Sequence, residues 1–192
     1  MLAHPVSCGY NAAMPRLLTL LAGALALLMV GCGPMIGLDV PFRGTPPAVV
    51  DAMLRLAAVT PADIVYDLGS GDGRIPLTAA RDFGARAVGI DIDAYLIRHS
   101  AEAARRAGLG DRVRFENQDL FVADFTEATV VTLYLSPEFN QRLRPKLQAM
   151  PRGTRIVSQR HDMGDWRPTQ EIEVVADGRP HRVMLWVVGG PP

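Results

Sequence analysis

Short apolar runs alternate with longer amphipathic segments along most of this chain. Runs with the length and composition of β-strands comprise residues 64–66, 87–90, 113–116, 129–135, 154–158, 171–176 and 181–188. Apolar residues recur at helical spacing in segments 46–58, 75–83, 94–107 and 137–150. Because strands and helices take turns, the pattern predicts an α/β fold with a mostly parallel sheet. Only residues 177–180 separate the last two strands, which predicts an antiparallel hairpin at the end of the chain.

Prolines set two of the expected helix boundaries. Thr45 stands directly before Pro46, so we predict Thr45 as the N-cap and Pro46 as the first residue of the first helix. Pro145 lies inside the last helical segment. A proline there removes a backbone hydrogen bond, so we expect this helix to kink or to end at Pro145.

A glycine-rich turn joins the first strand to the helix that follows it. Residues 67–74 read Asp-Leu-Gly-Ser-Gly-Asp-Gly-Arg, which puts Gly69, Gly71 and Gly73 at every second position. Glycines let a backbone turn sharply and come close to a ligand. The next strand ends at Asp91, where a carboxylate can accept hydrogen bonds from both hydroxyls of a ribose. Together these features predict an adenosine-containing ligand at the carboxyl edge of the sheet.

Spacing distinguishes this turn from two phosphate-binding motifs. A P-loop ends in Gly-Lys followed by Ser or Thr, and this chain has no such ending. The dinucleotide motif needs a third glycine three residues after the second, whereas here it comes after two and Arg74 follows. Asp67 and Asp72 would repel a pyrophosphate but would attract a ligand that carries a cationic amino group.

This turn, with the acid that ends the second strand, resembles the class I S-adenosylmethionine-dependent methyltransferases. The resemblance implies a three-layer, Rossmann-like, seven-stranded sheet that is mostly parallel and ends in an antiparallel hairpin. It also implies S-adenosyl-L-methionine as cofactor, contacted by Asp67, Gly69, Ser70, Gly71, Gly73, Asp91, Ile92, Asp119 and Leu120. Within the family, an acid after the third strand binds the adenine amino group, which implies that role for Asp119. Alternatively, Asp119 caps the turn that follows.

A narrower resemblance covers nearly all of residues 39–190. The chain is similar to a group of small protein-lysine methyltransferases of mitochondrial and archaeal type, through residues 39–46, 67–75, 134–137 and 162–168. This implies methyl transfer to an amine, with a protein lysine as the leading acceptor and a small-molecule amine as the next. The chain departs from the group at residues 42–44, close to where a substrate would enter. Residues 135–138 lack the Asn/Asp-Pro-Pro-Tyr signature of enzymes that methylate nucleic-acid amino groups.

Tyr134, Glu138 and Trp166 are the candidates for lining the acceptor pocket. Tyr134 and Trp166 would form an apolar mouth that desolvates the amine, and Glu138 would accept its hydrogen bonds. The alternatives are structural: Tyr134 as a core residue at a strand end, and Trp166 as a plug at the edge of the sheet. No residue is predicted to act as a general base.

The amino terminus has the form of a secretory signal. Arg16 precedes an apolar run over residues 17–30 and then Gly31-Cys32. A membrane-spanning helix needs about 20 apolar residues, so this run is too short. Its ending resembles a bacterial lipoprotein signal, which implies a lipid on Cys32 and a membrane tether. The chain thus divides into a signal-like segment (1–32), a linker with the entry motif, which begins at residue 39 (33–45), and a methyltransferase domain (46–190).

Two localisations, and with them two functions, follow from this segment. The protein is exported and anchored to a membrane if the signal is real, and cytoplasmic if translation starts at Met35. Export conflicts with a cofactor that is made in the cytoplasm. A second hypothesis is therefore an exported, membrane-tethered binding module that keeps the fold without transferase activity. The complete set of Asp67, the three glycines and Asp91 favours the enzyme.

Charge and cysteine usage narrow the range of partners. Lys and Arg number 20, as do Asp and Glu, so the formal net charge is +0. A nucleic-acid substrate normally calls for a positive face, so we predict no nucleic-acid partner. The four histidines are scattered and the only cysteines are Cys8 and Cys32. Metal chemistry is therefore not predicted.

Overall fold

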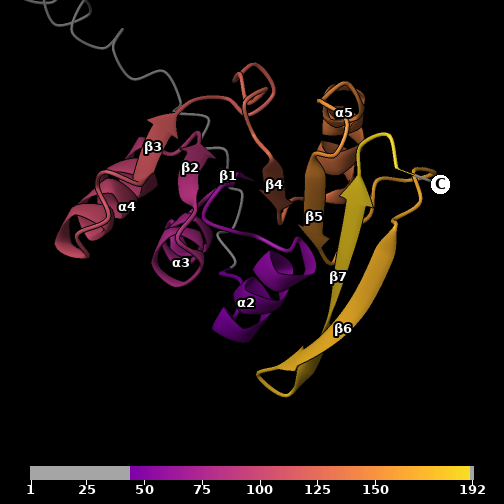
Figure 1. Cartoon of the computed structure of the whole chain (residues 1–192), viewed down its shortest axis with the longest axis horizontal. Coiled ribbons are helices and arrows are strands. Elements are labelled where there is room, and N and C mark those ends of the chain that lie inside the picture. Colours follow the sequence, from indigo (N-terminus) through magenta and orange to yellow (C-terminus); the bar gives the residue numbers. More distant parts are fainter. Residues whose placement is uncertain (1–43, 191–192) are drawn as a thin grey trace, which may run out of the picture. The chain divides into compact units, whose positions relative to one another are not determined.

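The computed structural model describes residues 44–190, and a seven-stranded sheet runs through this part of the chain (Figure 1). Its strands are β1 (Ile64–Leu68), β2 (Arg86–Asp91), β3 (Val113–Asn117), β4 (Val130–Leu133), β5 (Arg155–Gln159), β6 (Gln170–Ala176) and β7 (Arg179–Val187). They lie in the order β3-β2-β1-β4-β5-β7-β6. The pairs among β1 to β5 are parallel, and β7 is antiparallel to both β5 and β6. This arrangement confirms the predicted sheet.

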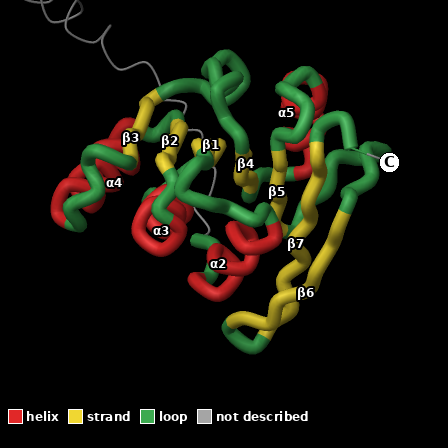
Figure 2. Tube along the Cα trace, viewed as in Figure 1, coloured by secondary structure: helices red, strands yellow, loops and turns green. Residues whose placement is uncertain are grey.

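Helices cover both faces of the sheet and complete three layers (Figure 2). They are α2 (Pro47–Leu56), α3 (Arg74–Phe83), α4 (Ala94–Arg106) and α5 (Pro137–Gln148). Buried residues of α2, α3 and α4 form one apolar cluster with the sheet, and those of α5 form another. Along β1, Val65 belongs to the first cluster and Tyr66 to the second, as the alternation of a strand requires.

One buried carboxylate, that of Asp63, connects the amino-terminal ends of three neighbouring strands. Asp63, the residue before β1, accepts hydrogen bonds from the Thr60 amide (2.8 Å) and the Thr129 hydroxyl (2.7 Å). It also forms an ion pair with Arg155, the first residue of β5. Because Thr129 directly precedes β4, Asp63 ties the starts of β1, β4 and β5 together. The carboxyl ends of these strands are thereby fixed relative to one another.

The prediction for Thr45 and Pro46 needs correction, and of the two outcomes expected at Pro145, a helix end is excluded whereas a kink stays a prediction. Helix α2 begins at Pro47, and Pro46 is its N-cap in an extended conformation (φ −57°, ψ 144°) with no side-chain cap bond, so Thr45 is not the cap. The physical reason is Pro47, which disfavours helical angles in the residue before it. Helix α5 does not end at Pro145 but continues to Gln148. Leu143 and Leu147 are buried on either side of Pro145, and their packing favours the continued helix.

The amino-terminal predictions lie outside the described residues. These are the signal-like segment 1–32 with Cys32, the part of the linker up to residue 43, and the alternative start at Met35. Between residues 44 and 190, none of the helices has the length and apolar character needed to cross a bilayer.

Candidate functional site

The glycine-rich turn follows β1 and is fastened to the end of β2. Gly69 has φ +82° and Gly73 φ +77°, values that favour glycine over any residue with a side chain. The amides of Gly69 and Ser70 both donate to the carbonyl of Ile90, at 2.8 and 2.9 Å. The turn therefore lies across the carboxyl edge of two adjacent parallel strands, which is where such sheets bind ligands.

Asp91 holds this turn and the start of the next loop at the same time. Its Oδ2 accepts from the Gly71 amide (2.8 Å), and its Oδ1 accepts from the Asp93 amide (2.9 Å). A carboxylate has about four acceptor positions, so each oxygen keeps one for a ligand. Two fixed acceptors side by side suit the paired hydroxyls of a ribose.

Small residues are required beneath the turn because Phe115 of β3 packs against it. A Cβ added to Gly73 would lie 2.6 Å from Phe115 Cζ, and one added to Gly89 would lie 2.5 Å from Phe115 Cδ1. The buried hydroxyl of Ser100 donates to the Gly71 carbonyl (3.1 Å) and fixes the turn from α4. Larger side chains at Gly73 or Gly89 would displace the turn from its position over β2.

Asp67 is a fully buried acid at the end of β1. Its carboxylate is 3 % exposed and accepts a hydrogen bond from the Thr132 hydroxyl of β4 (2.7 Å). Burial raises the pKa of Asp67 to about 7, and the charges of Asp91 and Asp72 act in the same direction. Within residues 44–190, the groups that hydrogen-bond to Asp67 or shift its pKa include no basic side chain. An acid in this state favours a ligand that brings its own cation.

Asp72, in contrast, is already paired. Its two carboxylate oxygens accept hydrogen bonds from the Arg74 guanidinium, at 2.9 and 3.0 Å from Nε. Although burial works to raise the pKa of Asp72, these bonds lower it. Arg74 also donates to the Thr45 carbonyl (2.7 Å), which ties the turn to the residues before α2. Of the two acids that the sequence offered to a cationic ligand, the structure leaves this role to Asp67.

The ends of β2 and β3 carry the remaining predicted cofactor residues. Ile92 is 56 % exposed at the end of β2, and Leu120 is half-buried beyond β3. Asn117 joins the two ends by donating to the carbonyls of Asp91 (3.0 Å) and Ile92 (2.9 Å). Asp119 accepts from the Phe121 amide (2.9 Å), which is the turn-capping role that the sequence left open. Its contact with adenine stays a prediction.

The acceptor-pocket candidates follow β4 and β5. Tyr134 is half-buried directly after β4, and Glu138 is exposed in the first turn of α5. Leu135 contacts the glycine turn, since a Cβ added to Gly69 would lie 2.8 Å from Leu135 Cδ2. Trp166 packs on the buried Trp186 of β7, with ring centroids 6.1 Å apart, and its carbonyl accepts from the Trp186 indole (2.8 Å). The segment that contains Tyr134 and Glu138 is therefore brought to the turn through Leu135, whereas Trp166 has a packing role.

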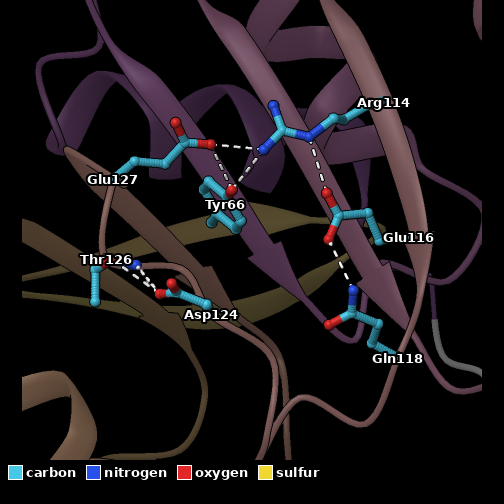
Figure 3. A pocket seen from close by; sticks show the side chains of 7 residues that line it. All are labelled: Tyr66, Arg114, Glu116, Gln118, Asp124, Thr126 and Glu127. Carbon is cyan, nitrogen blue, oxygen red and sulfur yellow. Dashed lines mark hydrogen bonds and ion pairs between the residues drawn. The ribbon is translucent and has the colours of Figure 1, made fainter.

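A polar pocket lies on the α5 side of the sheet, where the connection of residues 118–129 between β3 and β4 contains no helix (Figure 3). It is lined by Tyr66, Arg114, Glu116, Gln118, Asp124, Thr126 and Glu127. Arg114 donates to Glu116 (2.9 Å), to Glu127 (2.6 Å) and to the Tyr66 hydroxyl (2.7 Å). Arg114 and its three partners thus satisfy one another's hydrogen-bonding groups, at a place where no helix packs between β3 and β4 in sequence.

Several residues that shape the site were not singled out from the sequence. Thr132, Ser100, Asn117 and Phe115 act through contacts between segments far apart in the chain. Thr132 alone offered a signal, because it is a polar residue within an apolar strand that is buried throughout. Among residues 44–190 there is no group of three or more His, Cys, Asp or Glu side chains that could hold a metal ion.

The residues at this edge fit an adenosine that carries a cationic amino acid. Asp91 offers paired acceptors to a ribose, and Asp67 offers an uncompensated acid to an amino group. The Ser70 hydroxyl, in the turn between them, is buried without a hydrogen-bond partner in the described structure. A buried polar atom of this kind normally has a partner.

Comparison with known proteins gives a consistent picture. The family model of the ANTKMT methyltransferase domain matches residues 67–170. A protein-lysine N-methyltransferase of Saccharolobus islandicus is 41 % identical over 152 residues, which cover 78 % of this chain and 94 % of that protein. The adenine nucleotide translocase lysine N-methyltransferase of Mus musculus is 37 % identical over 155 residues, or 80 % of this chain and 65 % of the mouse protein.

Among solved structures, an RNA methyltransferase of Salinibacter ruber in complex with S-adenosyl-L-homocysteine is 50 % identical, with a TM-score of 0.71. The alignment covers 76 % of this chain and 94 % of that one. Its ligand has the ribose and the amino acid that the carboxyl edge described above can accept.

We predict that replacing Asp91 with alanine weakens binding of S-adenosylmethionine by about 1.5–3 kcal/mol for each charged hydrogen bond lost to the ribose. Calorimetric titration of the folded variant measures the change. Asp111→Ala, which removes an exposed acid before β3, is the matched control and should bind as the wild type does. Equal affinity of the Asp91 variant and the wild type would place the ribose elsewhere.

We also predict that cofactor affinity falls as the pH drops below the pKa of Asp67, about 7, because only the ionised acid attracts a cation. Below that pKa the dissociation constant should rise by roughly tenfold per pH unit, as linkage requires. Titrations with wild type and Asp67→Asn measure this. The variant should bind weakly with little pH dependence, and a variant that follows the wild-type pH profile would exclude Asp67 as the origin.

Proposed function

We propose that this chain, an S-adenosylmethionine-dependent methyltransferase that belongs to the ANTKMT methyltransferase domain family, transfers the methyl group to lysine side chains of proteins. The observation that carries the proposal is the contact between Leu135 and Gly69, which brings the segment after β4 against the cofactor turn. In that segment Tyr134 offers an aromatic surface and Glu138 an acid. This pairing suits an amine with an aliphatic stem. The Saccharolobus islandicus and Mus musculus relatives are both described as lysine methyltransferases.

The residues that would hold the cofactor are those of the carboxyl edge. Asp91 would accept the ribose hydroxyls, Asp67 would face the amino group, and Ile92 would pack on the base. When bound, S-adenosylmethionine supplies a methyl group already activated by its sulfonium. The protein then contributes mainly alignment of the acceptor with that methyl group and exclusion of water.

The acceptor must arrive without its proton. For a lysine with a pKa of about 10.4, removing the proton at pH 7 costs roughly 4–5 kcal/mol, at 1.36 kcal/mol per pKa unit. Partial burial beside Tyr134 reduces this cost, because a poorly solvated ammonium loses its proton more easily. Glu138 is exposed in the first turn of α5 and can attract the ammonium before it enters.

Two alternative functions, RNA methylation and an inactive binding module, have less support. The Salinibacter ruber structure is described as an RNA methyltransferase, but here the net charge is +0 and the base-methylation signature is missing from residues 135–138. The inactive, tethered binding module gains no support, because the family model and the relatives named above are all methyltransferases. RNA therefore belongs in the experiment as a competing acceptor.

The full-length protein, incubated with S-adenosylmethionine labelled in its methyl group, should label lysines of poly-L-lysine or of proteins in a lysate. Label should be lost on protease treatment and kept on ribonuclease treatment. Asp91→Ala should lower the labelling rate by at least tenfold at subsaturating cofactor, which is the factor that about 1.4 kcal/mol of lost binding gives. Label recovered in RNA from the same lysate, with none in protein, would refute the lysine assignment.

For the amino terminus we further propose export and a lipid anchor at Cys32, on the sequence of residues 16–32 alone. In bacteria fed radioactive palmitate, the wild type should take up label and fractionate with membranes. Cys32→Ser should lose both properties, and Cys8→Ser is the matched control. A protein whose first residue is Met35, found in the soluble fraction without label, would show that translation starts downstream.

A further inference from the structure

The turn after β5 places a histidine at the carboxyl edge of the sheet, on the side where Tyr134 and Glu138 follow β4. Strand β5 pairs in parallel with β4, and β4 with β1, so their carboxyl ends lie in a row. Adjacent strands are about 4.8 Å apart, which puts the end of β5 roughly 10 Å from that of β1. His161 is the second residue after β5 and is half-buried. It therefore lies one strand beyond the segment that contains Tyr134 and Glu138.

The backbone that carries His161 is held in an unusual conformation. Arg160 has φ +69°, a left-handed angle at a residue that is not glycine. The His161 amide donates to the Gln159 carbonyl (2.8 Å), which closes a three-residue γ-turn around Arg160. Such turns are strained, and strained residues cluster at functional sites. The sequence alone gives no sign of this turn.

Buried side chains from two elements impose the position of His161. Its carbonyl accepts from the Ser158 hydroxyl of β5 (2.6 Å) and from the Asn140 amide of α5 (2.9 Å). Both side chains are fully buried. The Arg160 amide donates to the Arg182 carbonyl of β7 (2.7 Å) and fixes the other side of the turn. The strain at Arg160 is therefore maintained by β5, β7 and α5 together.

Burial, more than the charged groups around it, favours the neutral form of the His161 imidazole. Burial and then the charge of Arg160 lower the pKa of His161 below 6.5, while Asp162 and Glu138 oppose that shift. Arg182 of β7 reduces the effect of Asp162 by pairing with it (3.7 Å). The Glu138 carboxylate, on α5, interacts electrostatically with His161. A neutral imidazole and a carboxylate thus lie within electrostatic range of each other, in the segments that follow β5 and β4.

We propose that His161 takes the proton that the substrate ammonium must lose, with Glu138 drawing the ammonium toward it. The proposal rests on lysine methylation as the reaction. The imidazole accepts one proton from the ammonium nitrogen, which frees the nitrogen lone pair. That pair then forms the new bond to the methyl carbon, the carbon–sulfur bond breaks, and its electrons stay on sulfur as a neutral thioether. The product is a protonated methylamine, and the imidazolium returns its proton to water.

The test compares wild type with His161→Ala and His161→Gln on poly-L-lysine, at saturating cofactor, from about pH 6 to about pH 9. Near pH 7, kcat should fall by about 10²–10⁴-fold in both variants, the usual contribution of a proton-transfer group. The deficit should shrink as the pH rises toward the lysine pKa of about 10.4, because the amine then loses its proton without help. Added imidazole should restore part of the activity of His161→Ala. Cofactor affinity should stay within about twofold of wild type, because the proposed role is confined to the acceptor.

His99→Ala, which removes an exposed histidine of α4, is the matched control and should keep the wild-type rate. Two outcomes overturn the inference while leaving lysine methylation intact: a kcat that is unchanged, or one that falls by the same factor at every pH and does not respond to imidazole. A fall in cofactor affinity equal to the fall in rate would also overturn it. A wild-type protein that binds the cofactor but labels no lysine overturns the proposed function itself, and the inference with it.

Discussion

The geometry of the candidate cofactor site, at the carboxyl edge of the sheet, depends on the carboxylate of Asp91. Each of its oxygens accepts a backbone amide, from Gly71 in the glycine turn and from Asp93 at the start of α4. One side chain therefore joins the turn, the end of β2 and the residue that precedes α4. Because both remaining acceptor positions then point in fixed directions, ribose hydroxyls would meet a preformed site. Much of the entropy of ordering that site is lost on folding and not on binding.

The acids of the site have different tasks because their neighbours differ. Asp72 is neutralised by Arg74 and stabilises the turn, whereas Asp67 is buried beside Thr132 and no basic group in the described part of the chain offsets its charge. An uncompensated buried acid opposes folding at high pH, because its pKa is higher in the folded state than in the unfolded chain. The protein keeps this unfavourable group where a positively charged ligand would relieve it, as expected of residues selected for binding.

The layout of strands and helices follows from the sequence because apolar periodicity is a local property. Asp67, the glycines and Asp91 could likewise be placed from their positions at strand ends. The rest depends on neighbours that are distant along the chain. Thr45 loses its expected cap role because a second proline follows Pro46, and α5 continues past Pro145 because Leu143 and Leu147 are buried. His161 could not be found, since the bonds that position it come from β5, β7 and α5 at once.

The ionisation of Asp67 has a consequence for the protein as part of a living cell. Its raised pKa lies close to neutrality, so if Asp67 binds the amino group of the cofactor, a small acidification of the surroundings would change the fraction of molecules able to accept it. Occupancy would then respond to two variables at once, the concentration of S-adenosylmethionine and the local acidity. A compartment that becomes acidic would slow methylation without an inhibitor, a modification or a second protein. In this molecule, the rate control would reside in one side chain.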